Sequence, residues 1–425
     1  MALDSEEFKA RRQAREEQRR QKQAQNRKTL IKLAIAAAVL ILCAVLILIV
    51  TRPGSAPDPA ETTVQTEPSG TTESVPAGTE PTTVIHYAAA GDLNINDLVV
   101  ASGGALYDYA PAFLDVAHLL ADADISSLNF EGNLLGAPYG SESASAPQTM
   151  MQALASAGVD LVQLANSYSI HKGMAGLAST IENVKNAGME PLGVYATNQE
   201  YKSGKGYTIR YVQGVKIAFV AFTKGMDGLA LPAGNEHCVN VLYTDYASTY
   251  QTVDTEGITT VLKAAAKEKP DITIALLHWG SEFNDTVSRS QKTICDLMLQ
   301  NGVDAIIGTH PHYVQEMVFD QDAGTFVSYS LGDFFGDAQR AGSEYSVILD
   351  LEITKDNKTG ETSITNYSYT PIFTVAEEEK PLRVVRIKEA MAAYEAGYID
   401  RVTQDTYEDM AYALKRIEAR ISGKG

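Results

Sequence analysis

Carboxylate, amide and imidazole side chains follow the ends of five apolar segments of this 425-residue chain. Each segment has the length and composition of a buried strand, and open α/β sheets bind ligands beyond the carboxyl ends of their strands. Oxygen and imidazole ligands suit Mn²⁺, Fe²⁺ or Zn²⁺ better than a thiolate site does. The sequence therefore predicts a divalent-metal site that holds one ion or two, if it holds any. Its candidate ligands are Asp92, Glu131, Asn166, His278, His310 and His312.

Each motif taken singly has a simpler explanation. A Gly-Asp pair after a strand is commonly a turn. Glu131 alone is explained equally well as a solvated carboxylate on a loop, and His278, which is next to Trp279, as a packed core residue. The His-Pro-His sequence at 310–312 is more specific, because its proline restrains two imidazoles on one loop. The combination favours a metal, since three of the seven histidines fall in these post-strand positions. The remaining four are interpreted as structural or surface residues: His86, His118, His171 and His237.

The elements that must position these residues alternate in type along the chain. Apolar runs of strand length occur at 84–90, 125–130, 161–165, 215–222, 272–278 and 303–308. Apolar residues at helical spacing occur over 175–187, 258–265 and 294–298. This alternation predicts an α/β fold with largely parallel strands. After Thr325 strand patterns follow one another directly, which predicts a second, antiparallel-rich sheet; the tail from Pro381 is predicted to be helical, with a cap at Thr403.

Composition excludes two broad classes of protein. With 45% hydrophobic and 21% charged residues the chain can bury a sizeable core, which excludes wholesale disorder. The net charge is −18, divided into +4 over residues 1–29 and −22 over the remaining 396 residues. So acidic a body argues against nucleic acid as a partner, since non-specific binding of nucleic acid needs a basic surface.

Residues 30–50 form an apolar segment of 21 residues with one charge, Lys32. As a helix it would span roughly 31 Å, the thickness of a bilayer core. A cleaved signal peptide has a shorter apolar region and a cleavage site that this segment lacks. We therefore expect an uncleaved single-pass anchor in the cell membrane, with the N-terminus cytoplasmic and the chain after Thr51 extracellular. Residues 51–83 follow, of which 18 of 33 are Thr, Pro or Ser, and they are expected to form a disordered linker.

The cysteines do not form a disulfide framework. Cys43 lies in the apolar segment, and Cys238 and Cys295 are 57 residues apart, so one bridge is possible but not required.

The chain contains, in order, the motifs GDLN, NFEGN, LANSYSIHKGMAGL, LLHWGSEF, GVDAIIGTHPHYVQ and SYSLGDFF. This order resembles the CapA-type capsule synthesis proteins, the poly-γ-glutamate biosynthesis family of the metallophosphatase-like superfamily. The resemblance covers residues 84–373. It implies a four-layer α/β/β/α sandwich and a membrane-anchored, outward-facing protein that assembles or exports an anionic polymer with membrane-bound synthesis and export proteins. The expected organisation is a basic tail (1–29), an anchor (30–50), a linker (51–83), the CapA-type domain (84–375) and a helical extension (376–425).

One motif departs from the family's pattern. Where the family usually reads Leu-Ala-Asn-Asn-His-x-x-Asp-x-Gly, this chain has Ser167 and Tyr168 after Asn166, and His171 in place of the aspartate. By analogy with metallophosphatases, the Asn-His pair supplies a metal ligand and the acid that protonates the leaving group. Tyr168 is a weaker acid than a histidinium, and His171 could supply the imidazole from a shifted position, so both are candidate catalytic residues. The family's Ser-Leu-Gly-Asn-Phe has also become Ser-Leu-Gly-Asp-Phe, which introduces Asp333.

Two classes of function remain open. The first is a non-hydrolytic or weakly catalytic surface protein that handles an anionic polymer such as poly-γ-glutamate. The alternative is a metal-dependent hydrolase that cleaves a phosphoester or the polymer's amide bonds. The candidate ligands favour a metal, whereas Ser167 and Tyr168 argue against fast turnover. The acidic body argues against simple electrostatic capture of a polyanion, unless metal ions or a local basic patch intervene. The first class is favoured.

Overall fold

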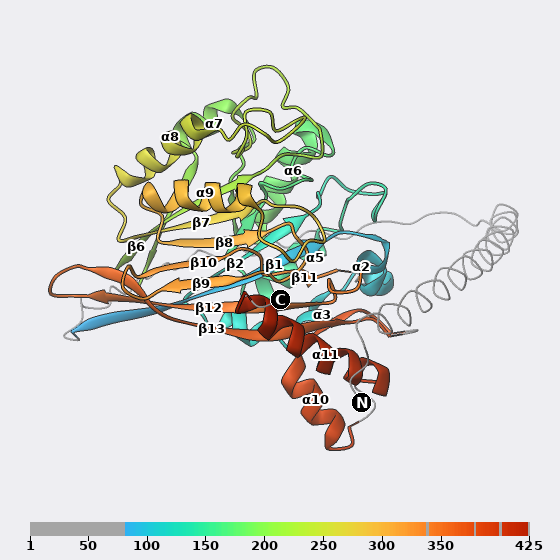
Figure 1. Ribbon diagram of the computed structural model, residues 1–425. Coiled ribbons are helices and arrows are strands. Elements are labelled where there is room, and N and C mark those ends of the chain that lie inside the picture. Colours follow the sequence, from blue (N-terminus) through green and yellow to red (C-terminus); the bar gives the residue numbers. More distant parts are fainter. Residues whose placement is uncertain (1–80, 337–339, 378–379, 399–401, 424–425) are drawn as a thin grey trace, which may run out of the picture. The chain divides into compact units, whose positions relative to one another are not determined.

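Figure 1 shows the computed structural model, which describes residues 81–336, 340–377, 380–398 and 402–423. The predicted basic tail and the predicted anchor lie outside the described residues, as does the predicted linker except for its last three residues. Two of those three, Thr82 and Thr83, begin the first strand. In the described part of the chain, no helix combines the length and the apolar character that a membrane span requires.

The first sheet is built around one long strand, β1 (Thr82–Asn94). On one side the sheet continues in parallel through β2 (Ile125–Glu131), β3 (Leu161–Gln163) and β4 (Glu190–Leu192). On the other side it continues antiparallel through β12 (Tyr345–Asp356), β13 (Thr362–Val375) and β14 (Arg383–Arg386). The short strand β11 (Asp333–Phe335) pairs in parallel with the end of β1.

The second sheet is built from the middle of the chain. Its parallel core consists of β6 (Val215–Thr223), β7 (Ile272–His278), β8 (Ala305–Thr309) and β10 (Thr325–Ser328). Antiparallel strands form its two edges, β5 (Tyr207–Val212) and β9 (Met317–Asp320). The strand order is therefore β5-β6-β7-β8-β10-β9.

Helices cover the outer faces of the two sheets, and further helices form the C-terminal part of the chain (Figure 1). Between β1 and β5 the chain forms α2 (Asp97–Ser102), α3 (Ala110–Phe113), α4 (Ala117–Ala121), α5 (Thr149–Ser156), α6 (Gly173–Asn186) and α7 (Asn198–Gly204). In the second sheet, α8 (Thr255–Ala266) lies between β6 and β7, and α9 (Arg289–Gln300) lies between β7 and β8. The last two helices, α10 (Ile387–Glu395) and α11 (Gln404–Ile421), follow β14.

Three hydrophobic clusters show how these elements are layered. Along β1 the side chains alternate, so that Ala88 packs against the helices α2–α6 and Tyr87 packs between the two sheets. Along β6, Phe219 faces the first sheet, whereas Val220 faces α8 and α9. Helices, sheet, sheet and helices therefore form the predicted four-layer α/β/β/α sandwich.

The prediction that the strands after Thr325 build a second, antiparallel-rich sheet of their own within the same unit is wrong. β10 joins the second sheet in parallel with β8, and β12–β14 extend the first sheet instead. The physical reason is the open edge of β1, which pairs with β12 from Thr82↔Asp356 to Ala89↔Leu349. The strand pattern shows that segments are extended, but it does not show which edge they join.

The tail from Pro381 is also not entirely helical, because β14 comes before its helices. Val384 of β14 packs toward the helices of the first sheet, and Val385 packs toward the other face. The predicted helix cap is confirmed: the side chain of Thr403 accepts a hydrogen bond from the backbone N–H of Thr406 at the start of α11.

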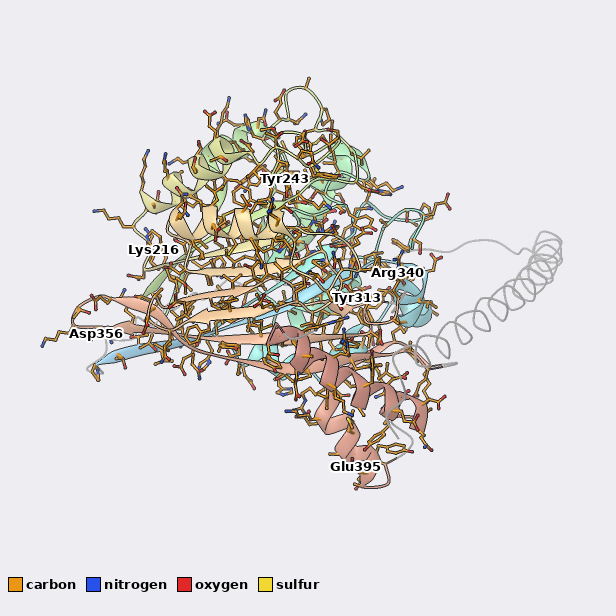
Figure 2. All side chains as sticks on the ribbon, in the orientation of Figure 1. Lys216, Tyr243, Tyr313, Arg340, Asp356 and Glu395 are labelled. Carbon is orange, nitrogen blue, oxygen red and sulfur yellow. The ribbon has the colours of Figure 1, made fainter. Side chains whose placement is uncertain are left out.

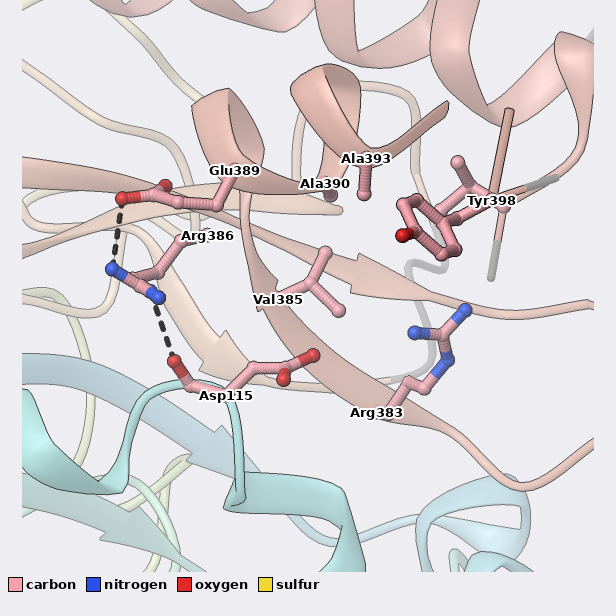
Figure 3. A pocket seen from close by; sticks show the side chains of 9 residues that line it. Asp115, Arg383, Val385, Arg386, Glu389, Ala390, Ala393 and Tyr398 are labelled. Atoms are coloured by element: carbon pink, nitrogen blue, oxygen red, sulfur yellow. Dashed lines mark hydrogen bonds and ion pairs between the residues drawn. The ribbon is translucent and has the colours of Figure 1, made fainter. Parts of the chain in front are cut away.

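Figure 3 shows a pocket of about 330 Å³ between β14 and α10. At the end of β14, Arg386 donates to the backbone oxygen of Asp115 at 3.1 Å and to the carboxylate of Glu389 at 2.8 Å. The first bond joins the C-terminal segment to the loop between α3 and α4, and this segment is part of the same compact unit. The predicted ligands do not line this pocket.

Candidate metal centre

The carboxyl ends of β1, β2, β7 and β8 bring five of the six predicted ligands together. Asp92 and Glu131 lie near the ends of β1 and β2, and His278 is the last residue of β7. The loop after β8 places His310 and His312 beside them. All five side chains are buried. Groups distant in the sequence therefore meet at one edge of the sandwich, as the positions after the strands predicted.

Together with Glu282 and Asp333, these five residues form three overlapping groups of potential metal ligands. Within each group, one nitrogen or carboxylate oxygen per residue lies within 4.8 Å of the others. The groups are Glu131–His278–His310, Glu282–His310–His312 and Asp92–His312–Asp333. The middle group shares His310 with the first group and His312 with the third, so the three groups lie next to one another.

The hydrogen bond of His278 to Thr223 fixes which ring nitrogen can bind a metal. The Thr223 hydroxyl donates its single hydrogen to the oxygen of Gly225 at 2.8 Å. It must therefore accept from Nδ1 of His278, which lies 3.0 Å away. The pKa of His278 is lowered to about 3, chiefly by burial, so the ring is neutral. Nε2 is then left as a lone pair, 2.8 Å from Oε1 of Glu131.

The other two histidines each have one ring nitrogen that forms no hydrogen bond with the described residues, Nε2 in His312 and Nδ1 in His310. Nδ1 of His312 lies 2.7 Å from Oδ1 of Asp333, a carboxylate–histidine contact that directs Nε2 elsewhere. Burial alone would lower the pKa of His312, but the Asp333 carboxylate raises it well above its ordinary value. In His310, Nδ1 is buried without a hydrogen-bond partner among the described residues. A buried, unpartnered imidazole nitrogen surrounded by carboxylates and imidazoles fits a divalent cation.

The carboxylates of the site are connected by Asn129. Its amide donates to Oδ1 of Asp92 at 2.7 Å and to Oε1 of Glu131 at 3.0 Å. Oδ2 of Asp92 accepts from the backbone N–H of His310 at 2.9 Å, which joins the first sheet to the histidine loop. Burial, reinforced for Asp92 by the charge of Glu131, raises the pKa of each carboxyl to about 7. Bound cations would reverse this effect by favouring the ionised carboxylates.

Asn166 lies next to the ligand groups, but its amide is used within the protein. It donates to Oδ1 of Asn129 at 3.0 Å and to the oxygen of Phe130 at 2.6 Å. Its own carbonyl oxygen accepts from the backbone N–H of Tyr168 at 2.9 Å. The contacts thus show Asn166 positioning Asn129, and its role as a metal ligand stays a prediction.

The two candidate catalytic residues lie on the same loop. Tyr168 is half-buried, and burial together with the charges of Glu131, Glu282 and Asp227 raises its pKa. Its hydroxyl therefore stays protonated at neutral pH. The ring of His171 lies 5.8 Å from that of Tyr168, and His171 belongs to none of the three ligand groups.

The family model for "Bacterial capsule synthesis protein PGA_cap" matches residues 86–338, more than half of the chain. This chain belongs to that family. It is 27% identical over 221 residues to the capsule biosynthesis protein CapA of Bacillus anthracis, covering 51% of this chain and 49% of the relative. It is 26% identical over 202 residues to the PGA biosynthesis protein CapA of Bacillus subtilis (strain 168), covering 47% and 48%. The chain thus spans about half the length of the curated relatives it matches.

Two solved structures are similar to this chain at lower identity. One is a calcineurin-like phosphoesterase from Bacillus subtilis, 15% identical, with a TM-score of 0.43 over 79% of this chain and 100% of the other. Another is described as a novel phosphatase from Mycoplasma pneumoniae, 14% identical, with a TM-score of 0.42 over 75% and 99%.

Sequence reasoning missed five residues that the PGA_cap domain places in or beside the ligand groups. They are Asn129, Thr223, Lys224, Glu282 and Asp333. Thr223 and Lys224 follow the predicted strand at 215–222, so the rule that selected the other ligands would have found them. Glu282 lies four residues after His278 in the same motif. The departure at Asp333 was visible in the sequence, but its contact with His312 was not.

The loop that carries Glu282 is held in place from two directions. The backbone N–H of Phe283 donates to the oxygen of Pro311 at 2.9 Å, and the Phe283 ring stacks on His312 at 5.0 Å. Farther along this loop, Asp285 accepts from two arginines of α11, which lies beyond the family match. These are Arg416 at 3.1 Å and Arg420 at 3.2 Å.

Replacing Thr223 with valine should lower the affinity for Zn²⁺ or Mn²⁺ by about 10–100-fold, the usual effect of losing the partner that orients a histidine ligand. Valine has the shape of threonine but cannot accept from Nδ1 of His278, so the imidazole loses its fixed tautomer. Calorimetric titration with the metal would measure the effect. Thr223→Ser keeps the hydroxyl and is the control; equal losses in both variants would contradict the argument.

Without metal, the protein should become less stable as pH rises above about 6.5. Three groups hold more protons in the folded protein than in the unfolded chain: the pKa values of Asp92 and Glu131 are raised to about 7, and that of His312 is also raised. The protons that they bind stabilise the folded state, and this stabilisation is lost as pH rises. Below 6.5 the lowered pKa values of His278 and His310 act in the opposite direction, so the sign is clear only above that pH.

Thermal unfolding of chelator-treated and metal-saturated protein between pH 6.5 and 8.5 checks this expectation. The Tm of chelated protein should fall across this window, and the metal should reduce the slope. Glu131→Gln should also reduce it, because the amide does not titrate. A Tm of chelated protein that rises with pH would show that these groups are ionised differently.

Proposed function

We propose that this protein acts in the biosynthesis of a capsular, poly-γ-glutamate-type anionic polymer, and that it handles the polymer at a divalent-metal centre. Membership of the PGA_cap family and the similarity to the CapA biosynthesis proteins of two Bacillus species support the capsule role. One observation carries the metal centre: the buried group Glu131–His278–His310, in which Nδ1 of His310 has no other described partner.

The residues around the centre would divide the work between holding and orienting. Glu131, His278 and His310 would hold one ion, and the groups that contain His312 would hold a second. Thr223 and Asp333 keep the His278 and His312 rings in their orientations. A divalent metal, when bound, supplies Lewis acidity toward a carbonyl, carboxyl or phosphoryl oxygen.

The second candidate function is a metal-dependent hydrolase that acts on a phosphoester or on the polymer's amide bonds. The observation that favours it is the overlap of the three ligand groups through His310 and His312, since pairs of adjacent ions stabilise both the attacking and the leaving oxygen of a displacement. Against it stands Tyr168, whose raised pKa makes its hydroxyl a hydrogen-bond donor and a poor acid. Polymer handling therefore remains the preferred function.

Metal analysis and polymer assays on the purified full-length protein test both candidates. We expect about one or two equivalents of Mn, Fe or Zn per chain, and metal-dependent binding of poly-γ-glutamate whose length distribution stays unchanged. Shortening of the polymer, or turnover of a generic phosphodiester, would favour the hydrolase. A protein that retains neither metal nor polymer would overturn the proposal.

We further propose that the protein is anchored in the cell membrane by residues 30–50 and meets membrane-bound synthesis and export proteins on the outer side. The proposal rests on the apolar segment and its basic flank. Protease added to intact cells should release a fragment that begins within residues 51–83. Full protection of the protein in intact cells, with cleavage only after lysis, would contradict this topology.

A further inference from the structure

A positively charged side chain lies at each end of the histidine loop, His310–His312. What we infer from these two side chains rests on the proposed function. The first is Lys224, which directly follows β6 and therefore lies at the same edge as His278. Its ammonium donates to the oxygen of Gly280 at 2.9 Å and lies 3.4 Å from Nε2 of His310. The Tyr250 ring lies beneath it, 4.8 Å from the ammonium.

Lys224 is half-buried, and no carboxylate among the described residues forms an ion pair with it. Burial lowers its pKa, while the more distant charge of Glu282 acts in the opposite direction. Of the three hydrogens of the ammonium, one is donated to the oxygen of Gly280 and a second can reach Nε2 of His310, which leaves one for a ligand. Partly desolvated cations of this kind gain most from an anion that the ligand itself supplies.

The second cation is Arg340. Its guanidinium lies over the Phe283 ring, 4.2 Å from the centroid, and the same ring stacks on His312. Figure 2 shows Arg340 and Tyr313 at the end of the molecule away from Lys216, which is near the start of β6. In the part of the chain that the structure describes, no ion pair involves Arg340. The loop from His310 to His312 thus has Lys224 beside its first histidine and Arg340 beyond its last.

These positive charges contrast with their surroundings. The full chain carries −18, and the ligand groups themselves include Asp92, Glu131, Glu282 and Asp333. A protein with this net charge repels a polyanion unless cations intervene at the place where the polyanion binds. Lys224 and Arg340, together with the bound metal, would supply that local positive charge.

We propose that Lys224 and Arg340 are two carboxylate-binding subsites, one on each side of the metal centre, and that a polycarboxylate chain crosses the histidine loop between them. Lys224 binds one carboxylate as a point charge. Arg340 binds another with its planar fork, which matches a carboxylate with two parallel hydrogen bonds. A ligand with a single carboxylate would occupy only one subsite and bind more weakly.

Binding of poly-γ-glutamate to the full-length, Mn²⁺-saturated protein tests the proposal. Lys224→Met and Arg340→Met should each weaken binding about tenfold or more, because each removes a charge-assisted contact. The double variant should lose about 100-fold if the subsites act independently. Lys263→Met, on an exposed position of α8, removes the same charge and should stay within about twofold of the wild type.

Two further measurements separate the subsites from folding and from metal binding. Lys224→Arg keeps the charge and should retain most of the affinity, and metal titration of every variant shows whether the Lys224 change acts through His310. Wild-type affinity in both methionine variants, an equal loss in Lys263→Met, or a loss explained wholly by lost metal would overturn the subsites alone. A wild-type protein that holds metal but binds no polymer would overturn the proposed function, and the subsites with it.

Discussion

Replacing His310 and His312 together with alanine should lower divalent-metal affinity by more than about 100-fold, exceeding the usual loss from an outer-shell partner. All three ligand groups contain one of these two histidines, and the middle group contains both. The double variant therefore leaves none of these groups complete. Metal analysis after dialysis should find less than a tenth of the wild-type content.

The fold should survive this change, because the apolar clusters that hold the layers together contain neither histidine. The backbone dihedral φ is 89° at His310 and 58° at His312, so each occupies a left-handed conformation that alanine tolerates no better. The loss of the Phe283–His312 stacking should cost about 1 kcal/mol.

A matched control removes two histidines outside the site. His86 and His237 lie at exposed positions, and His86→Ala with His237→Ala should retain the metal of the wild type. Full metal content in the His310/His312 variant, with its thermal transition intact, would show that the ion is held elsewhere.

Much of this site could be predicted because strand ends are local features of the sequence. The apolar run at 272–278 corresponds to β7, so the position of His278 at a strand's carboxyl end follows from the pattern alone. The two sheets were harder to assign, since β12 could have paired with any open edge. Its residues pair with residues of β1 that lie 260 or more positions earlier in the chain, and such non-local pairing leaves no short-range signal.

Contacts between the loops could not be predicted for the same reason. Asp333 is 21 residues from His312, and it reaches this histidine only because β11 pairs with the end of β1. The lysine beside His310 shows the same limit, since Lys224 lies 86 residues earlier. Sequence position identified residues that point toward the shared edge, but the partner of each residue depends on how the two sheets meet.

Restoring the family residues in the altered loop, Ser167→Asn with Tyr168→His, should raise hydrolysis of a generic phosphodiester by about 10²–10⁴-fold, the usual contribution of one general acid. The structure explains why Tyr168 cannot supply this acid: burial and the charges of Glu131, Glu282 and Asp227 raise its pKa, so that its proton is held tightly. An imidazolium is a far stronger acid than a phenol. The backbone contact of residue 168 with Oδ1 of Asn166 does not involve the replaced side chain, so the loop should keep its shape.

Single variants show which change matters. Tyr168→Phe removes the hydroxyl but keeps the ring, and it should leave hydrolysis at the low wild-type level; Ser167→Asn alone should add little, because it supplies no acid. His171 provides the decisive contrast, since its ring lies 5.8 Å from that of Tyr168. A wild-type protein that hydrolyses the substrate rapidly, and loses this activity in His171→Ala, would show that the loop had moved its acid by three residues. The preferred non-hydrolytic function would then be wrong, and the metal-dependent hydrolase would take its place.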